Sequence, residues 1–335
     1  MREEVQLIKE SAREFLLKEV AGREVSIDRN GLDPGLLSRV RDQGFMTAVI
    51  PQEDGGSGLD RDSYLAVLNE MAKYSGSLAA AIFMFNSIEY PLIRETGSKS
   101  LLNEFVSSAG QIALDCRLFS YGGSGSAGDL YMFPDSRVVA TLQNDVIRIY
   151  RKESENPEVV SQLGFRGIRF GHLHGPFGEE VGSFSGSGKF ISGLMERTSE
   201  EIASIVLGIS STALAKAVEY SKVRYAFGSP LKAFQPIAFP LAMRMAQLSI
   251  LENFVFSGSE KSRLELIGER EISLDFARDT TKLALQTHGG YGYIEDFGVE
   301  MLYRDALFAG SFFWPRSEHM RSMATALYED EAGSI

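Results

Sequence analysis

Tyr220-Ser-Lys-Val-Arg-Tyr-Ala-Phe-Gly228 is the stretch of this sequence that says most about the fold. The residues before it are apolar at every third or fourth position, which predicts a long helix reaching towards Val223. The apolar positions are Ile202, Ile205, Val206, Ile209 and Ala213. Glycine is common just after a helix end, and an arginine near that end complements the helix dipole. Taken alone, the stretch leaves open whether Arg224 binds a ligand or has only this structural role.

The rest of the chain falls into three regions by its hydrophobic pattern. Residues 1–110 have helical periodicity, interrupted by a glycine-rich turn, and residues 184–335 have it again, in segments separated by short polar breaks. Between them, residues 111–183 hold short segments rich in Val, Ile and Tyr, such as Arg137 to Leu142 and Val146 to Tyr150. The pattern predicts a mainly α protein with an N-terminal helical domain, a small middle β domain and a C-terminal helical bundle.

Charge and composition exclude several classes of protein. The formal net charge is -11, which leaves no basic stripe for nucleic acid. The most apolar stretch, Ser77 to Phe85, is much shorter than the roughly 20 residues of a membrane helix. The N-terminus lacks the apolar core of a secretory signal, and the single cysteine, Cys116, cannot form an intramolecular disulfide. We therefore expect a cytoplasmic protein that does not bind nucleic acid or span a membrane.

Few side chains suggest a nucleophile or a metal site. A lone cysteine is usually a small buried hydrophobe, and we interpret Cys116 in this way. His172 and His174 stand two residues apart, but no third ligand is visible, so we expect no metal. The loop Tyr121-Gly-Gly-Ser-Gly-Ser-Ala-Gly128 lacks the Gly-Lys-Ser/Thr ending of a P-loop and is interpreted as a flexible connection.

Three motifs, in this order, resemble those of the acyl-CoA dehydrogenase family. Val49-Ile-Pro-Gln-Glu-Asp-Gly-Gly-Ser-Gly58 resembles its P-E-x-x-G-G-x-G turn. Tyr220 to Gly228, followed by Pro230 and Phe234-Gln235, resembles Y-x-x-x-R-x-x-F-G-x-P and the f-Q after it. Gln286-Thr-His-Gly-Gly-Tyr-Gly-Tyr293 and the later Arg-Asp-Ala resemble Q-x-x-G-G-x-G-[FY] and R-D-A. The resemblance implies the family's fold, in which the C-terminal domain is a four-helix bundle.

The resemblance also implies a FAD site formed between subunits. Arg224 takes the place of the arginine that reaches the pyrophosphate of a FAD lying mainly on the neighbouring subunit, a task suited to its fork of donors. By position, the other implied flavin contacts are Phe227, Gln235, Gln286, Gly289 and Gly290. Paired glycines let a backbone come close to such a cofactor. We therefore expect at least a dimer, either homomeric or heteromeric.

The reaction implied by the resemblance is α,β-dehydrogenation of an acyl-CoA thioester, as in fatty acid metabolism. A carboxylate takes the α-proton while the β-hydride passes to the flavin, which an electron-transferring flavoprotein then reoxidises. In the medium-chain type the base is a glutamate in an E-G-T segment after R-D-A. Here Phe312, Phe313 and Trp314 stand in the matching stretch, and no carboxylate does. Glu318 comes too late and is interpreted as a solvated helix-surface residue.

In the isovaleryl type the base stands near the start of the long helix, a position that falls here on Thr198. Glu196, Glu200 and Glu201 lie close by, and a gap in the alignment would move one of them into place. Their other interpretation is structural, because acidic residues in a first helical turn complement the dipole and cap free amides. The catalytic residue is thus left unassigned.

The middle domain departs further from the family. It is short, Leu114 to Gly125 only partly matches the family's T-E-p-x-x-G-S-D, and the W-I-[ST] segment is missing. Three functions therefore remain open. The chain is a divergent FAD-dependent acyl-CoA dehydrogenase, or a base-lacking subunit like that of the mixed acyl-CoA dehydrogenases of steroid side-chain breakdown, or a flavin-free binding protein on the same fold.

Overall fold

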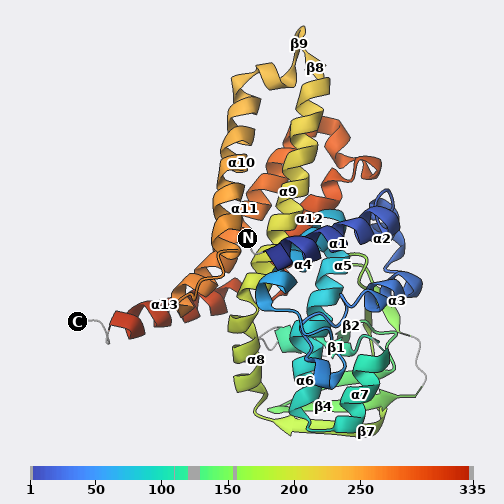
Figure 1. Cartoon of the computed structure of the whole chain (residues 1–335). Helices are drawn as coiled ribbons and strands as arrows, with labels where there is room; N and C mark the ends of the chain where they lie inside the picture. Colours follow the sequence, from blue (N-terminus) through green and yellow to red (C-terminus); the bar gives the residue numbers. More distant parts are fainter. Residues whose placement is uncertain (1–2, 109, 120–128, 154–156, 332–335) are drawn as a thin grey trace.

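The computed structural model describes residues 3–108, 110–119, 129–153 and 157–331 (Figure 1). Helices form both ends of the described chain, from Glu3 and up to Glu331, and a β-sheet lies between them in sequence. The predicted fold class, mainly α with a helical, β, helical order, is therefore confirmed. The loop from Tyr121 to Gly128, which the sequence suggests is a flexible connection, lies outside the described residues.

The N-terminal region consists of helices with clear start signals. They are α1 (Glu3–Glu19), α2 (Glu24–Asn30), α3 (Pro34–Asp42), η1 (Gln52–Asp54), α4 (Arg61–Tyr74), α5 (Gly76–Phe83), η2 (Met84–Glu89), α6 (Tyr90–Glu95) and α7 (Lys99–Ser108). The Asp60 carboxylate accepts a 2.9 Å hydrogen bond from the backbone N–H of Ser63, and Asp33 caps α3 in the same manner. Each cap satisfies backbone N–H groups that have no partner within the helix.

The glycine-rich turn from Val49 to Gly58 separates α3 from α4, as predicted. A Cβ atom on Gly56 would lie 2.1 Å from the carbonyl oxygen of Ile50, so no other residue fits there. Gly55 has a φ of +89°, which also favours glycine. The glycines of this motif are thus explained by the path of the backbone.

The middle region forms a seven-stranded sheet with the strand order β5-β6-β2-β1-β3-β4-β7. The strands are β1 (Ala113–Asp115), β2 (Leu130–Met132), β3 (Val138–Gln143), β4 (Val146–Lys152), β5 (Glu158–Val160), β6 (Phe170–His172) and β7 (Gly178–Ser185), and η3 (Cys116–Phe119) follows β1. The hairpin β3–β4 corresponds to the two strands predicted from sequence. Strand β7 continues to Ser185, slightly beyond the predicted domain boundary at residue 183.

The C-terminal region contains the predicted bundle. Its elements are α8 (Ser187–Arg197), α9 (Ser199–Val223), β8 (Tyr225–Ala226), β9 (Ser229–Pro230), η4 (Leu231–Ala233), α10 (Gln235–Val255), α11 (Arg263–His288), η5 (Gly289–Tyr293), η6 (Glu295–Phe297), α12 (Val299–Phe312) and α13 (Arg316–Glu331). Helix α9 packs against α10, α11 and α12, and the β8–β9 hairpin stands at one end of this bundle (Figure 1). Helix α13 extends away from the bundle.

Among the residues that the structure describes, two helical runs are long and apolar enough to cross a membrane, Gly76–Glu95 and Ser199–Val223. The first includes the apolar stretch Ser77 to Phe85, and both runs are mostly buried inside the protein. Helix α9 packs against α4 as well as against the bundle, so it forms part of the core. Core packing therefore accounts for their apolar composition.

The sulfur of Cys116 is buried, as the sequence led us to expect. Burial raises the pKa of this thiol to about 12, so the reactive thiolate is scarce at neutral pH. His172 and His174 stack at a ring-centroid distance of 6.5 Å. Within the described ranges, no group of three His, Cys, Asp or Glu side chains is arranged to hold a metal ion.

Candidate cofactor-binding site

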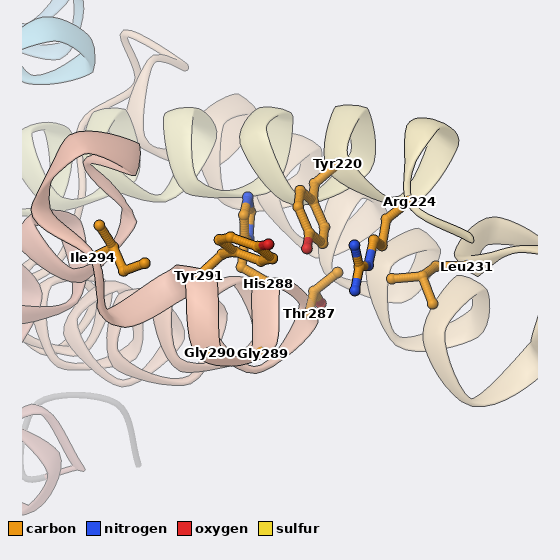
Figure 2. Close-up of a pocket in the computed structure, with 9 residues that line it drawn as sticks. All are labelled: Tyr220, Arg224, Leu231, Thr287, His288, Gly289, Gly290, Tyr291 and Ile294. Carbon is orange, nitrogen blue, oxygen red and sulfur yellow. The ribbon is translucent and has the colours of Figure 1, made fainter. Parts of the chain in front are cut away.

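A pocket of about 360 Å³ opens between α9 and the turn after α11 (Figure 2). Figure 2 shows Tyr220 and Arg224 reaching into it from α9, opposite Gly289 and Gly290. Its lining consists of Tyr220, Arg224, Leu231, Thr287, His288, Gly289, Gly290, Tyr291 and Ile294. The pocket thus joins the second and third sequence motifs, which are separated in sequence by most of α10 and α11.

Arg224 provides the positive charge of this pocket. It follows the last residue of α9, and its backbone is fixed by hydrogen bonds of 2.9 Å to the Tyr220 carbonyl and 2.8 Å from the Leu231 N–H. The guanidinium lies 5.7 Å from the centre of the Tyr291 ring, where a cation–π interaction orients it. In the described part of the chain, no carboxylate lies within 4.0 Å of it. The charge is therefore available for an anion.

The glycines of the third motif have two different roles. A Cβ atom on Gly289 or Gly290 would meet no other atom within 4 Å, so the backbone there is open to a ligand. Gly289 also has a φ of +57°, which favours glycine. At Gly292, in contrast, a Cβ atom would lie 2.6 Å from the Leu285 carbonyl oxygen. Gly292 is thus required by packing, while Gly289 and Gly290 leave room at the pocket.

His288 forms part of the pocket wall. Its ring stacks on Tyr220 at a centroid distance of 4.3 Å, and its Nδ1 lies 2.8 Å from the Ala284 carbonyl oxygen. Burial lowers the pKa of His288 below its ordinary value, so the ring is neutral at pH 7. No local sequence pattern relates His288 to Tyr220, so only the structure reveals this stack.

Three other predicted flavin contacts lie outside the pocket. Phe227 is fully exposed in the turn of the β8–β9 hairpin. Gln235 is the first residue of α10, and Gln286 belongs to the last turn of α11; both side chains are exposed. The structure thus brings together Arg224, Gly289 and Gly290 and leaves these three facing outward, where their cofactor roles stay predictions.

Sequence reasoning did not name most of the pocket wall. Tyr220 and Tyr291 stand within the quoted motifs, and their aromatic character next to an arginine and two glycines was the available clue. Leu231 and Ile294 lie outside the quoted motifs, and Thr287 stands at a position of the third motif that any residue can occupy. They line the pocket only because the bundle brings α9, η4 and η5 together.

The acidic residues considered as alternative bases are engaged in ion pairs. Glu200 accepts a 2.7 Å hydrogen bond from buried Lys261 and also pairs with Arg61. Glu201 is buried and lies 3.3 Å from Arg61. These pairs tie the start of α9 to α4 and to the segment before α11. Both residues lie in the first turn of α9, as the structural interpretation requires, and their ion pairs add contacts between elements to that role.

The remaining candidates also have structural partners. Glu196 accepts a 2.9 Å hydrogen bond from Arg263. The hydroxyl of buried Thr198 donates to the Leu194 carbonyl at 2.7 Å. Glu318 pairs with Arg321 at 2.7 Å, and its side chain is only 16% exposed, so it is less solvated than predicted. None of these residues lines the pocket of Figure 2.

Replacing Glu201 by glutamine should flatten the dependence of stability on pH. Burial raises the pKa of Glu201 from 4.5 to about 7, against the opposing effect of Arg61. The folded state therefore binds more protons than the unfolded state in this range, and stability falls as pH rises from 4.5 to 7. From urea unfolding at pH 5 and pH 8, we expect the variant to lose roughly 1–3 kcal/mol less than the wild type over this interval.

Asp305 is a second buried carboxyl whose pKa burial raises to about 7, so part of the wild-type slope should remain. Glu219→Gln is the control, because Glu219 lies on the same helix with a side chain that is 69% exposed. An identical pH slope in Glu201→Gln and wild type would show that Glu201 titrates normally in the folded protein.

Two domains of one family match this chain. The acyl-CoA dehydrogenase N-terminal domain matches residues 2–109, and the acyl-CoA dehydrogenase C-terminal domain matches residues 194–312. The short-chain-specific acyl-CoA dehydrogenase of Megasphaera elsdenii is 26% identical over 88% of this chain and 90% of its own. A subunit of the caffeyl-CoA reductase–Etf complex of Acetobacterium woodii is 26% identical over 90% of this chain and 92% of its own.

The fold is similar to that of solved structures with lower sequence identity. The butyryl-CoA dehydrogenase of Megasphaera elsdenii aligns with a TM-score of 0.79 at 22% identity, over 98% of this chain and 99% of that one. The two matched domains cover most of the described helices, and the pocket of Figure 2 lies within the second. The chain belongs to the acyl-CoA dehydrogenase family.

Proposed function

We propose that this chain is a subunit of a hetero-oligomeric acyl-CoA dehydrogenase that supplies part of a FAD site to a neighbouring subunit and has no catalytic base of its own. The observation that carries the proposal is a contrast between two places. Arg224, Gly289 and Gly290 form an open pocket, whereas Phe313, in the stretch where the family has its base, is 2% exposed. In this proposal the chain keeps the residues that contact a neighbour's FAD and lacks the carboxylate that acts as the base.

The pocket suits the phosphate groups of a flavin nucleotide. An unpaired guanidinium is a strong donor to a pyrophosphate, and the open edge at Gly289 and Gly290 gives access to the backbone. Tyr291 keeps the Arg224 side chain in place before a ligand arrives. In this proposal Phe227, Gln235 and Gln286 are exposed because they also contact a cofactor held by the neighbour.

Helix α10 provides a surface for that neighbour. Phe239, Met243 and Ile250 recur along one stripe of this helix and are 63%, 61% and 68% exposed. Large apolar side chains gathered on one face of a helix mark a surface that another chain covers. We propose that a related acyl-CoA dehydrogenase subunit covers this stripe and holds the remainder of the FAD site.

In such an assembly FAD, when bound, would supply the acceptor for the β-hydride of an acyl-CoA thioester. Arg224 contributes by holding the anionic end of the cofactor, and the neutral His288–Tyr220 stack excludes water from the wall of the pocket. The base that removes the α-proton comes from the neighbour. We propose a cytoplasmic location and reoxidation by an electron-transferring flavoprotein, in line with the relative that belongs to an Etf complex.

A second candidate is the homomeric enzyme, with Glu201 as its base. Burial gives Glu201 a pKa of about 7, which is suitable for a general base. Its ion pair with Arg61 and its burial speak against it, because a buried carboxylate held by an arginine is poorly placed to meet a substrate. We therefore favour the hetero-oligomer.

Flavin content tests the proposal. The tagged chain is purified alone, then with added FAD, and also from its host together with whatever assembles with it. Light scattering and the visible spectrum give the mass and the flavin content of each sample. We expect flavin only in the assembly with a second acyl-CoA dehydrogenase subunit. Stoichiometric FAD on the purified chain would support the homomeric enzyme, and an assembly without flavin would support a binding protein.

A further inference from the structure

The turn between α12 and α13 carries three aromatic residues, Phe312, Phe313 and Trp314. Trp314 has a φ of +62°, in the left-handed region that glycine adopts readily and larger residues rarely do. The family's E-G-T segment places a glycine in this turn. The backbone at position 314 therefore suits glycine, but the residue there is tryptophan, which has the largest side chain of all. Trp314 is only 1% exposed.

The rings of this turn are packed against rings from three other parts of the chain. The pairs, with their ring-centroid distances, are Phe313 and Phe83 at 5.2 Å, Trp314 and Phe119 at 5.6 Å, and Phe312 and Phe170 at 5.3 Å. The partner rings belong to α5, η3 and β6. The turn is therefore fixed to the N-terminal helices and to the β region at the same time, and its aromatic volume fills the space between them.

A buried arginine holds the backbone of the turn. Arg270 of α11 is 0% exposed, and its guanidinium donates to the carbonyl oxygen of Phe313 and to the carboxylate of Glu271. If the turn moved, the buried guanidinium of Arg270 would lose the Phe313 carbonyl oxygen as an acceptor, and water could not reach it as a replacement. Leaving a buried charge short of partners is unfavourable, so the contact opposes any opening of the turn.

From these contacts we infer that Phe312, Phe313 and Trp314 form an aromatic plug that closes this chain's own acyl-binding centre, with Arg270 as the positioning residue that keeps the plug in place. The inference rests on the proposed function and extends it. An acyl thioester that entered this centre would have to displace Phe313 and Trp314 together. Each pair of unlike subunits therefore binds and oxidises acyl-CoA only in the centre of the partner subunit.

The chain contains a single tryptophan, Trp314, so its fluorescence reports on the plug directly. The full-length wild-type chain is titrated with butyryl-CoA and octanoyl-CoA, with free CoA as the control, while the emission maximum and acrylamide quenching are recorded. We expect the blue-shifted, weakly quenched emission of a buried indole, unchanged at the highest acyl-CoA concentration. A saturable shift or loss of emission with acyl-CoA but not with CoA would overturn the plug.

Two variants test the role of Arg270. Arg270→Met should increase the acrylamide quenching constant of Trp314 several-fold, whereas Arg278→Met, on the exposed side of the same helix, should leave it unchanged. Arg270→Lys keeps the charge without the planar fork and should give an intermediate value. Quenching at the wild-type level in a folded Arg270→Met protein would show that Arg270 does not hold the plug in place.

If circular dichroism shows that both Arg270 variants are unfolded, the wild-type titration still decides the plug. Because the fluorescence is measured on the chain without its partner, it does not depend on the flavin content of the assembly. A plug that stays closed in a chain whose assembly lacks flavin would refute the proposed function and leave the plug intact. A plug that opens in a chain whose assembly carries flavin would refute the plug and leave the proposed function intact.

Discussion

Phe313→Ala should lower the free energy of unfolding by about 3–5 kcal/mol, the usual loss when a buried phenylalanine is truncated. Phe313 is 2% exposed and lies edge-on to Phe83, with further ring contacts to Phe165 and Phe312. These rings come from α5, the segment before β6 and the end of α12, so the site cannot collapse around the cavity without moving several elements. Urea unfolding followed by circular dichroism measures the change.

Phe227→Ala is the matched control, because it makes the same chemical change in a side chain that is fully exposed. Its effect on the unfolding free energy of the isolated chain should stay within about 0.5 kcal/mol. If Phe313→Ala also cost less than about 1 kcal/mol, the turn would be loosely packed. That outcome would contradict the close packing on which the plug depends.

Arg224→Gln should weaken FAD retention by the assembly roughly 10- to 100-fold, since charge-assisted hydrogen bonds contribute about 1.5–3 kcal/mol. Arg224 is the pocket residue with a positive charge, and no carboxylate in the described part of the chain competes for it. Glutamine keeps polar donor capacity but loses the charge and the fork. Equilibrium dialysis of the assembly against FAD gives the dissociation constants of wild type and variant.

Lys222→Gln is the control for this change. Lys222 lies in the last turn of the same helix, and its side chain is 47% exposed and pairs with Glu219. Removing its charge alters the net charge of the chain as much as Arg224→Gln does, but it lies outside the pocket lining. Wild-type FAD affinity in Arg224→Gln, or an equal loss in both variants, would contradict a direct contact between Arg224 and the cofactor.

Periodicity and motifs were sufficient to predict the order of the helical and β regions. The apolar stripe of α9 is visible in sequence because a helix buries every third or fourth residue. Arg224, Gly289 and Gly290 stood in recognisable motifs, and the structure brings these three together. The glycine-rich turn was also predictable from sequence. A Cβ atom on Gly56 would lie 2.1 Å from the Ile50 carbonyl oxygen, so only glycine fits there.

Contacts between residues far apart in sequence were not predictable. The stack of His288 on Tyr220 and the ion pair of Lys261 with Glu200 join positions that no single helical pattern relates. The same holds for the rings that enclose Phe313, because each belongs to a different local pattern. The sequence showed that no carboxylate stands in the stretch matching the medium-chain base, but only the packed structure reveals that the aromatic side chains of this stretch are buried against other rings.

By itself, this chain should be unable to oxidise an acyl thioester. The most direct test is an anaerobic titration of the purified chain, supplied with excess FAD, with butyryl-CoA, octanoyl-CoA and palmitoyl-CoA while the flavin absorption is followed. We predict that the visible flavin band keeps its full intensity in all three titrations and is bleached only when the partner subunit is present. Bleaching by a thioester in the chain alone would show that a catalytic base exists here after all.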